Sequence, residues 1–202
     1  MLQKNITRNL SPVDRWEQER QTLELEARRA KIAAILQKSK KPFRVLPEVE
    51  KWQAQYKDLR DRYRFLTLSG GSCLGKTQFA LSLCPPGMET LELNMASSPE
   101  PDLREFVHGR HGLVLFDEMH PSVCLKQKKA FQAGLAMVQL GCSTTNCYSY
   151  SKCLFGARLV VCNNSWSQDL QKMPPHDREW ILDNSVHIEV TKPLYQTAEA
   201  DQ

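Results

Sequence analysis

Three largely apolar runs stand out along the chain, and each is followed at once by polar residues. They are Tyr63–Leu68, Gly112–Phe116 and Ala157–Val161. Short apolar runs of this kind are typical of strands that are buried on both faces of a parallel sheet. Two further strands are predicted, at Thr90–Leu93 and, from its alternating pattern, at Ser185–Val190. The sequence therefore predicts an α/β protein with a mostly parallel central sheet.

Helical periodicity and capping signals predict helices before and between these strands. Ser11 and Pro12 have the spacing of a helix start, and this first helix can continue to about Gln37. Its apolar positions fall near a heptad seam, so it either joins copies of the chain or packs on its own domain. The remaining predicted helices are Leu46–Asp61, Gln78–Leu83, Asp102–Val107, Cys124–Leu140 and Asp177–Asp183.

The stretch between the second and third apolar runs combines a long helical pattern with a strand-like one. The helix Cys124–Leu140 is expected to end at Gly141, and Ser143–Ser151 has the Thr, Tyr and Ser content of a strand. Lys152 and Gly156 then suggest a hairpin-like excursion before the next strand. The side chains expected to face inward from the helix are Phe131, Leu135 and Val138.

The predicted elements divide the chain into a basic helical extension over 1–45, a main domain over 46–195 and a tail over 196–202. Although the net charge is only +4, residues 1–64 carry 16 Lys and Arg against 9 Asp and Glu, whereas 65–202 carry 11 against 14. A basic segment of this kind either contacts polyanions or is a solvated helical surface.

Neither a membrane span nor a disulfide framework is expected from the sequence. No apolar run approaches the roughly eighteen residues that a membrane helix needs, and the polar N-terminus lacks the apolar core of a signal peptide. Seven cysteines without a C-x-x-C pair favour free thiols in a reducing, intracellular compartment. A zinc site is not expected, because few histidines accompany them.

The first apolar run leads into Gly70-Gly71-Ser72-Cys73-Leu74-Gly75-Lys76-Thr77, which has the spacing of a phosphate-binding loop. The glycines let backbone N–H groups surround a phosphate, and the helix that follows turns its positive end toward the same anion. Lys76 would bind the β- and γ-phosphates, and the Thr77 hydroxyl would ligate Mg²⁺. The alternative is a glycine turn with an incidental Lys-Thr pair. The strand before it and the helix after it favour a nucleotide site.

The other two apolar runs end in residues that complete such a site. Asp117 and Glu118 follow the second run, and Asn163 follows the third. Because the carboxyl ends of parallel strands meet at one edge of a sheet, these residues are expected beside the phosphate loop. Asp117 would hold Mg²⁺, Glu118 would polarise the attacking water, and Asn163 would orient it against the γ-phosphate. An ordinary polar turn at each strand end is the alternative.

These three elements, in this order, resemble those of superfamily-three helicases. The closer resemblance is to the helicase domain of replication-associated (Rep) proteins of circular single-stranded DNA viruses, the geminivirus-like ones above all. It is carried by the G-x-S-x-x-G-K-T loop, the Val160-x-Cys162-Asn163 strand end and the segment from Trp180 to Tyr195. The resemblance implies a three-layer α/β sandwich of the AAA+ P-loop type. It also implies an ATP- and Mg²⁺-dependent helicase that acts as a homo-oligomeric ring on single-stranded DNA, with RNA as the other possible substrate, and a nuclear location if the protein is virus-like.

The resemblance assigns further roles by position. A hairpin that contacts DNA in the ring channel would correspond to 141–156, with Lys152 gripping the strand and Tyr148 or Tyr150 stacking on bases. A solvated turn lysine is the alternative for Lys152. An arginine that reaches the neighbouring subunit's γ-phosphate would be Arg178, with Arg158 as the other candidate.

The chain also departs from full-length Rep proteins. Their nicking domain carries a His-hydrophobic-His metal motif and a Tyr-x-x-Lys nucleophile, and the sequence contains neither, so DNA nicking is not expected. Two other functions remain open. One is an ATP-binding nucleic-acid-binding or assembly module, a Rep relic without unwinding activity. The other is a small-molecule P-loop kinase, which is disfavoured because no Arg-rich lid segment is found.

Overall fold

The computed structural model describes residues 42–96, 100–141 and 149–196, together with positions 16, 20, 23 and 24. The chain divides into two units, Met1–Pro42 and Phe43–Gln202. In the first unit, Trp16, Arg20, Leu23 and Glu24 are helical, and Arg20 lies 3.9 Å from Glu24 in an i,i+4 ion pair. The rest of the helix predicted from Ser11 lies outside the described residues.

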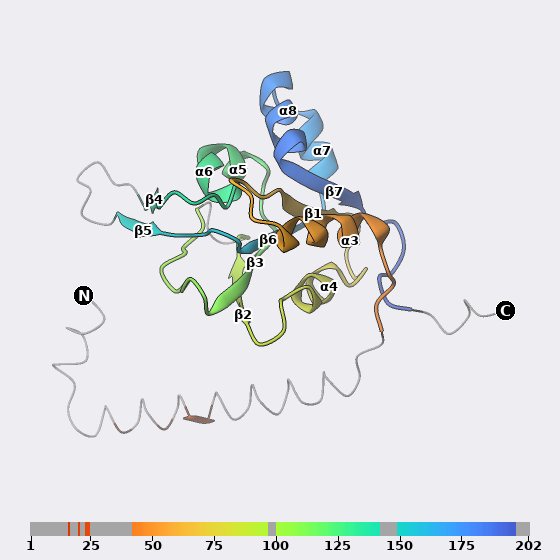
Figure 1. Cartoon of the computed structure of the whole chain (residues 1–202). Coiled ribbons are helices and arrows are strands. Elements are labelled where there is room, and N and C mark those ends of the chain that lie inside the picture. Colours follow the sequence, from red (N-terminus) through yellow and green to blue (C-terminus); the bar gives the residue numbers. More distant parts are fainter. Residues whose placement is uncertain are drawn as a thin grey trace. The chain divides into compact units, whose positions relative to one another are not determined.

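The second unit is built on a five-stranded sheet in the order β2-β3-β6-β1-β7 (Figure 1). All four pairs of neighbouring strands are parallel, as the sequence predicts. The strands are β1 (Phe65–Ser69), β2 (Glu89–Asn94), β3 (His111–Asp117), β6 (Arg158–Asn163) and β7 (Ser185–Glu189). The central strands β1, β3 and β6 are almost fully buried, which explains why their sequences read as largely apolar runs.

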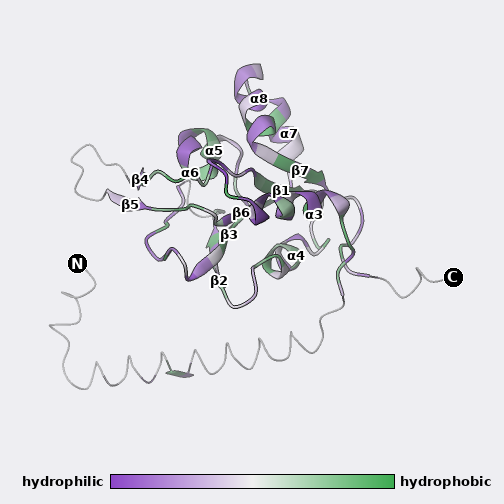
Figure 2. Ribbon diagram, viewed as in Figure 1, coloured by the Kyte–Doolittle hydropathy of each residue, from purple (hydrophilic) through white to green (hydrophobic). Residues whose placement is uncertain are grey.

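Helices cover both faces of this sheet, and the chain therefore forms three layers. One hydrophobic cluster joins α3 (Pro47–Ala54) and α4 (Lys76–Ser82) to the sheet through side chains such as Trp52, Phe79 and Leu68. A second cluster covers the other face. Its helices are α5 (Ser122–Lys126), α6 (Lys128–Phe131), α7 (Trp166–Gln171) and α8 (Pro175–Asn184). Hydrophobic residues are concentrated in the central strands, and polar ones on outer turns such as those of α6 (Figure 2).

Alternation along the strands decides which face each side chain joins. Leu113, Leu115, Val160 and Cys162 belong to the cluster under α4, whereas their neighbours Val114, Phe116, Leu159 and Val161 belong to the opposite cluster. The same period of two places Asp117 and Asn163, the last residues of β3 and β6, on opposite faces of the sheet. Of these two residues, only Asp117 therefore faces the loop that follows β1.

Several predicted elements differ in the structure. The predicted helix Leu46–Asp61 is α3 followed by a 3-10 turn, η2 (Gln55–Lys57). Asp102–Val107 is not helical but a turn. The helix α7 was not predicted at all, and Tyr195, the last residue of the predicted main domain, pairs with Phe43 in an isolated β-bridge.

The predicted helix Cys124–Leu140 is also wrong in its second half. The chain leaves the helical conformation at Ala133, whose φ is 42°, and Leu135 is 61% exposed rather than inward. Val138 is buried as predicted, but in a strand, β4 (Val138–Leu140), which pairs antiparallel with β5 (Tyr150–Lys152). An antiparallel pair of strands between the acids and the third strand end is thus present, and residues 142–148, which separate the two strands in the sequence, lie outside the described part.

None of the helices in the described part of the chain is long and apolar enough to cross a membrane. The five described cysteines, Cys73, Cys84, Cys124, Cys153 and Cys162, are free thiols. Burial raises the pKa of Cys124 and Cys162, so both remain protonated and act as small apolar side chains in the core.

A polar network lies between β1, α7 and β7. His187 contacts the buried Thr67 hydroxyl through Nδ1 at 2.8 Å and the Ser167 hydroxyl through Nε2 at 3.1 Å. Ser167 also donates to the Glu189 carboxylate. Burial lowers the pKa of His187, and the nearby Glu189 only partly opposes this effect. The imidazole is therefore neutral in the folded protein at pH 7.

The network predicts a stability that falls on mild acidification. Since the pKa of His187 is lower in the folded than in the unfolded chain, the unfolded chain takes up a proton first as the pH drops below about 6.5. The contribution of neutral His187 is thus complete above that pH and is lost as the pH falls toward the folded-state pKa. Urea unfolding of the wild type and His187→Gln across this window should show the pH slope in the wild type and a flatter one in the variant. Equal slopes would contradict this role.

Candidate functional site

The predicted phosphate loop, residues 70–75 between β1 and α4, forms a tight backbone turn. Gly70 and Gly75 have φ angles of 139° and 84°, which glycine adopts without strain, and Cys73, with a φ of 62°, takes a left-handed conformation that is unusual for a residue with a side chain. At Gly75 space is a second constraint, because a Cβ atom there would lie 2.7 Å from Cε2 of the Tyr195 ring. The loop and the first turn of α4 border a cavity of about 250 Å³. Its lining residues are Ser72, Cys73, Leu74, Gly75, Lys76, Thr77, Gln78, Asp117, Glu118 and Asn164.

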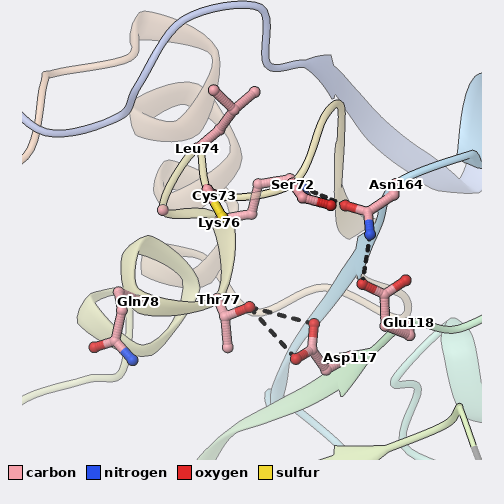
Figure 3. A pocket seen from close by; sticks show the side chains of 10 residues that line it. Ser72, Cys73, Leu74, Lys76, Thr77, Gln78, Asp117, Glu118 and Asn164 are labelled. Atoms are coloured by element: carbon pink, nitrogen blue, oxygen red, sulfur yellow. Dashed lines mark hydrogen bonds between the residues drawn. The ribbon is translucent and has the colours of Figure 1, made fainter.

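The strand register brings three strand ends to this cavity. Ser69 pairs with Asn163, and Cys162 with Asp117, so β1, β6 and β3 end at one level. Each strand passes directly into a polar segment at that edge. Lys76, Thr77, Asp117 and Glu118, all predicted from the sequence, lie together there (Figure 3).

The side chain of Lys76, the first residue of α4, turns back into the loop that precedes the helix. Its buried ammonium donates to the carbonyl oxygens of Gly70 at 2.8 Å and Gly71 at 2.7 Å, and to Oδ1 of Asn164 at 2.8 Å. These three bonds match the three protons of an ammonium group. A phosphate in the cavity would therefore replace partners that Lys76 already has.

Asn164 connects Lys76 to Glu118. While its Oδ1 accepts from Lys76, its Nδ2 donates to Oε1 of Glu118 at 2.8 Å, so the amide bridges a cation and a carboxylate across the cavity (Figure 3). Glu118 itself has a φ of 58°, unusual for a residue with a side chain, and its N–H donates to the Cys162 carbonyl. This hydrogen bond ties the turn after β3 to the end of β6.

Asn163, the residue predicted to contact the γ-phosphate, does not line the cavity. Its buried amide donates to the Met119 carbonyl at 2.8 Å and accepts from the Ser165 N–H at 2.6 Å. The reason is the alternation along β6: Cys162 faces α4, Asn163 faces the opposite cluster that contains Met119, and Asn164 returns to the α4 face. The sequence signal for Asn164 was its distance of two residues from Cys162, which places both side chains on the same face, and the sequence prediction missed it. Gln78 was missed as well.

The Thr77 hydroxyl and the Asp117 carboxylate have the geometry and chemistry of a shared cation site. Thr77 Oγ1 lies 3.3 and 3.4 Å from the two oxygens of Asp117. Hydroxyl and carboxylate oxygens are the hard donors that Mg²⁺ prefers, and Mg²⁺ commonly takes only one or two protein ligands, with water and phosphate completing its shell. The residues present therefore fit the predicted ion.

Two of the three residues predicted to contact nucleic acid, Lys152 and Tyr150, have partners within the described part of the chain. Lys152 donates to the carbonyl oxygens of Arg104 and Phe106, both at 2.6 Å. The Tyr150 hydroxyl accepts from the Leu103 N–H at 2.8 Å, and its ring faces Arg104. Together these bonds fasten β5 to the 102–106 turn. Tyr148 lies outside the described residues.

Lys152→Ala should therefore act on stability before it acts on nucleic-acid binding. We expect a loss of about 1 kcal/mol in the free energy of unfolding, because two carbonyls lose a charged donor. In an oligonucleotide titration, the dependence of affinity on salt should stay unchanged. A salt slope that falls by about one unit with no loss of stability would instead indicate a phosphate contact and contradict the anchoring role.

The two candidate arginine fingers lie in different surroundings. Arg158, at the start of β6, is half-buried at the end of the sheet opposite the cavity, donates to the Leu83 carbonyl and lies 5.5 Å from the Tyr56 ring. Burial lowers its pKa, and this position suits a structural role. Arg178, on α8, is partly exposed and does not line the cavity; no ion-pair partner for it is found in the described ranges.

Comparison with models of known protein families finds no match, and a search of curated proteins finds none either. The features that characterise the chain are therefore its parallel α/β sheet, its glycine-rich turn and the polar strand ends beside that turn.

Proposed function

We propose that the chain binds ATP with Mg²⁺ at the cavity and hydrolyses it, as a P-loop NTPase of the AAA+ type. The observation that carries this proposal is the convergence of a buried lysine, a hydroxyl, two carboxylates and an amide at the ends of β1, β3 and β6. Each of these groups has a distinct task in phosphoryl transfer to water.

The roles follow from position and chemistry. Lys76 neutralises charge on the β- and γ-phosphates, and the backbone N–H groups of the loop bind the same oxygens. Thr77 and Asp117 supply oxygen ligands to Mg²⁺, which when bound offsets the charge that develops on the phosphates. Glu118 accepts a hydrogen bond from the attacking water and orients it. When Lys76 turns to the phosphates, Asn164 loses the donor to its Oδ1, and its Nδ2 group donates one proton to the γ-phosphate and the other to Glu118, so the amide couples that phosphate to Glu118.

The direct test is ATP hydrolysis, measured with and without single-stranded DNA. We expect a basal ATPase that single-stranded DNA stimulates, as in a helicase or translocase of the Rep type. Light scattering with an ATP analogue and oligonucleotide should then show a homo-oligomer. If the protein hydrolyses no ATP under any of these conditions, the helicase or translocase function is ruled out.

A second candidate function is an ATP-binding nucleic-acid-binding or assembly module without unwinding activity. It is favoured by one observation, the double hydrogen bonding of Lys152, which leaves that side chain occupied rather than free to grip a strand. Nucleotide-dependent oligomerisation or oligonucleotide binding with no strand separation would support it. Strand separation that requires ATP hydrolysis would rule it out.

A further inference from the structure

An aromatic pair lies on the outer side of the phosphate loop. The rings of Phe43 and Tyr195 stack with their centroids 5.0 Å apart and their planes 25° from parallel. The two segments that carry them come from opposite ends of the domain and pair through an isolated bridge and the bond from Arg44 N–H to Leu194 O at 2.8 Å (Figure 1). Both rings are only partly buried, so aromatic surface remains open to solvent.

This pair contacts the loop at residues that also line the cavity. The Leu194 N–H donates to the Leu74 carbonyl at 3.0 Å, and the Tyr195 ring lies directly against Gly75. Phe43 meets Phe79 edge-on, with centroids 5.4 Å apart, and Phe79 follows the cavity residue Gln78. The aromatic surface is therefore a direct continuation of the cavity wall.

The cavity itself suits phosphates and a cation but not a base. Apart from Leu74 and Cys73, its lining consists of glycine and polar or charged side chains, and no aromatic ring is among them. A nucleotide held there by its phosphates must place its base outside, next to the loop.

We propose that Tyr195, supported by Phe43, is the platform on which the base of the bound nucleotide stacks. The proposal rests on the proposed nucleotide site and deepens it: the ligand is a nucleoside triphosphate, recognised at both ends, rather than any triphosphate-bearing molecule. An aromatic ring suits this task because stacking on a base is favourable without a specific hydrogen-bond pattern.

The test compares ligands with and without a base. Isothermal titration of the full chain with ATP and with inorganic tripolyphosphate, both with Mg²⁺, gives two dissociation constants for the wild type, Tyr195→Leu and Tyr195→Phe. We expect the wild type to prefer ATP. Tyr195→Leu should lose about tenfold in ATP affinity while its tripolyphosphate affinity stays unchanged, and Tyr195→Phe, which keeps the ring, should behave as the wild type.

The tripolyphosphate arm separates stacking from loop integrity. If Tyr195→Leu lowers the affinity for both ligands equally, the ring only shapes the loop and the stacking proposal is wrong. The stacking proposal is also wrong if neither affinity changes, or if the wild type binds tripolyphosphate as tightly as ATP. In both cases the proposed phosphate site is unaffected. A wild type that binds neither ligand would overturn the proposed function together with the platform.

Discussion

Lys76→Ala is expected to reduce ATP hydrolysis by at least about 100-fold and to abolish measurable ATP binding. The substitution removes the only ammonium group among the residues that line the cavity, and a lost charge-stabilising donor at a phosphoryl-transfer site costs on this order. Steady-state phosphate release and titration with an ATP analogue measure the two effects.

Two controls keep this result interpretable. Lys129→Ala changes an exposed lysine on α6, on the other face of the sheet, and should leave both measurements unchanged. Circular dichroism should show that Lys76→Ala still folds, although the Gly70 and Gly71 carbonyls lose their donor. Hydrolysis within a few-fold of the wild type would contradict the assignment of Lys76.

Asn164→Ala and Asn163→Ala are expected to fail in different ways, although the two residues are adjacent. Asn164 bridges Lys76 and Glu118, so its loss should lower the turnover number by roughly 100-fold; because Asn164 is exposed and water can replace its bonds, its loss should cost less stability than that of Asn163. Asn163 is buried and bonded to Met119 and Ser165, so its loss should cost about 1–3 kcal/mol of unfolding free energy.

The pair is its own matched control, since both variants remove the same amide. Turnover at saturating ATP and urea unfolding should be measured on each protein. If Asn163→Ala were the one that lost turnover while remaining fully stable, the assignment from strand alternation would be overturned.

The centre of the sheet was predictable because β1, β3 and β6 are buried on both faces and read as largely apolar runs. The loop, Asp117 and Glu118 were predictable for a related reason: each directly follows such a run, and parallel strands deliver their ends to one edge. For these residues, the local sequence and the geometry of the parallel sheet both predict a position at the same edge of the sheet.

The misses arose where tertiary contacts decide the outcome. Helical spacing over Cys124–Leu140 gave way because Gly134 passes close to the Asp61 carbonyl and the chain reverses there into β4. The choice of Asn163 over Asn164 depended on which face of the sheet carries α4. Position alone predicted Lys152 as a DNA contact or a solvated turn lysine and gave no sign that the 102–106 turn supplies it with two acceptors.

The measurement that tests the central claim most directly is a crystal structure with a non-hydrolysable ATP analogue and Mg²⁺. The account predicts the triphosphate within the Gly70–Thr77 loop, Mg²⁺ bound by Thr77 and Asp117, and Asn164 turned from Lys76 toward the γ-phosphate. An analogue bound elsewhere on the domain, with the Lys76–Asn164–Glu118 bridge intact, would contradict it.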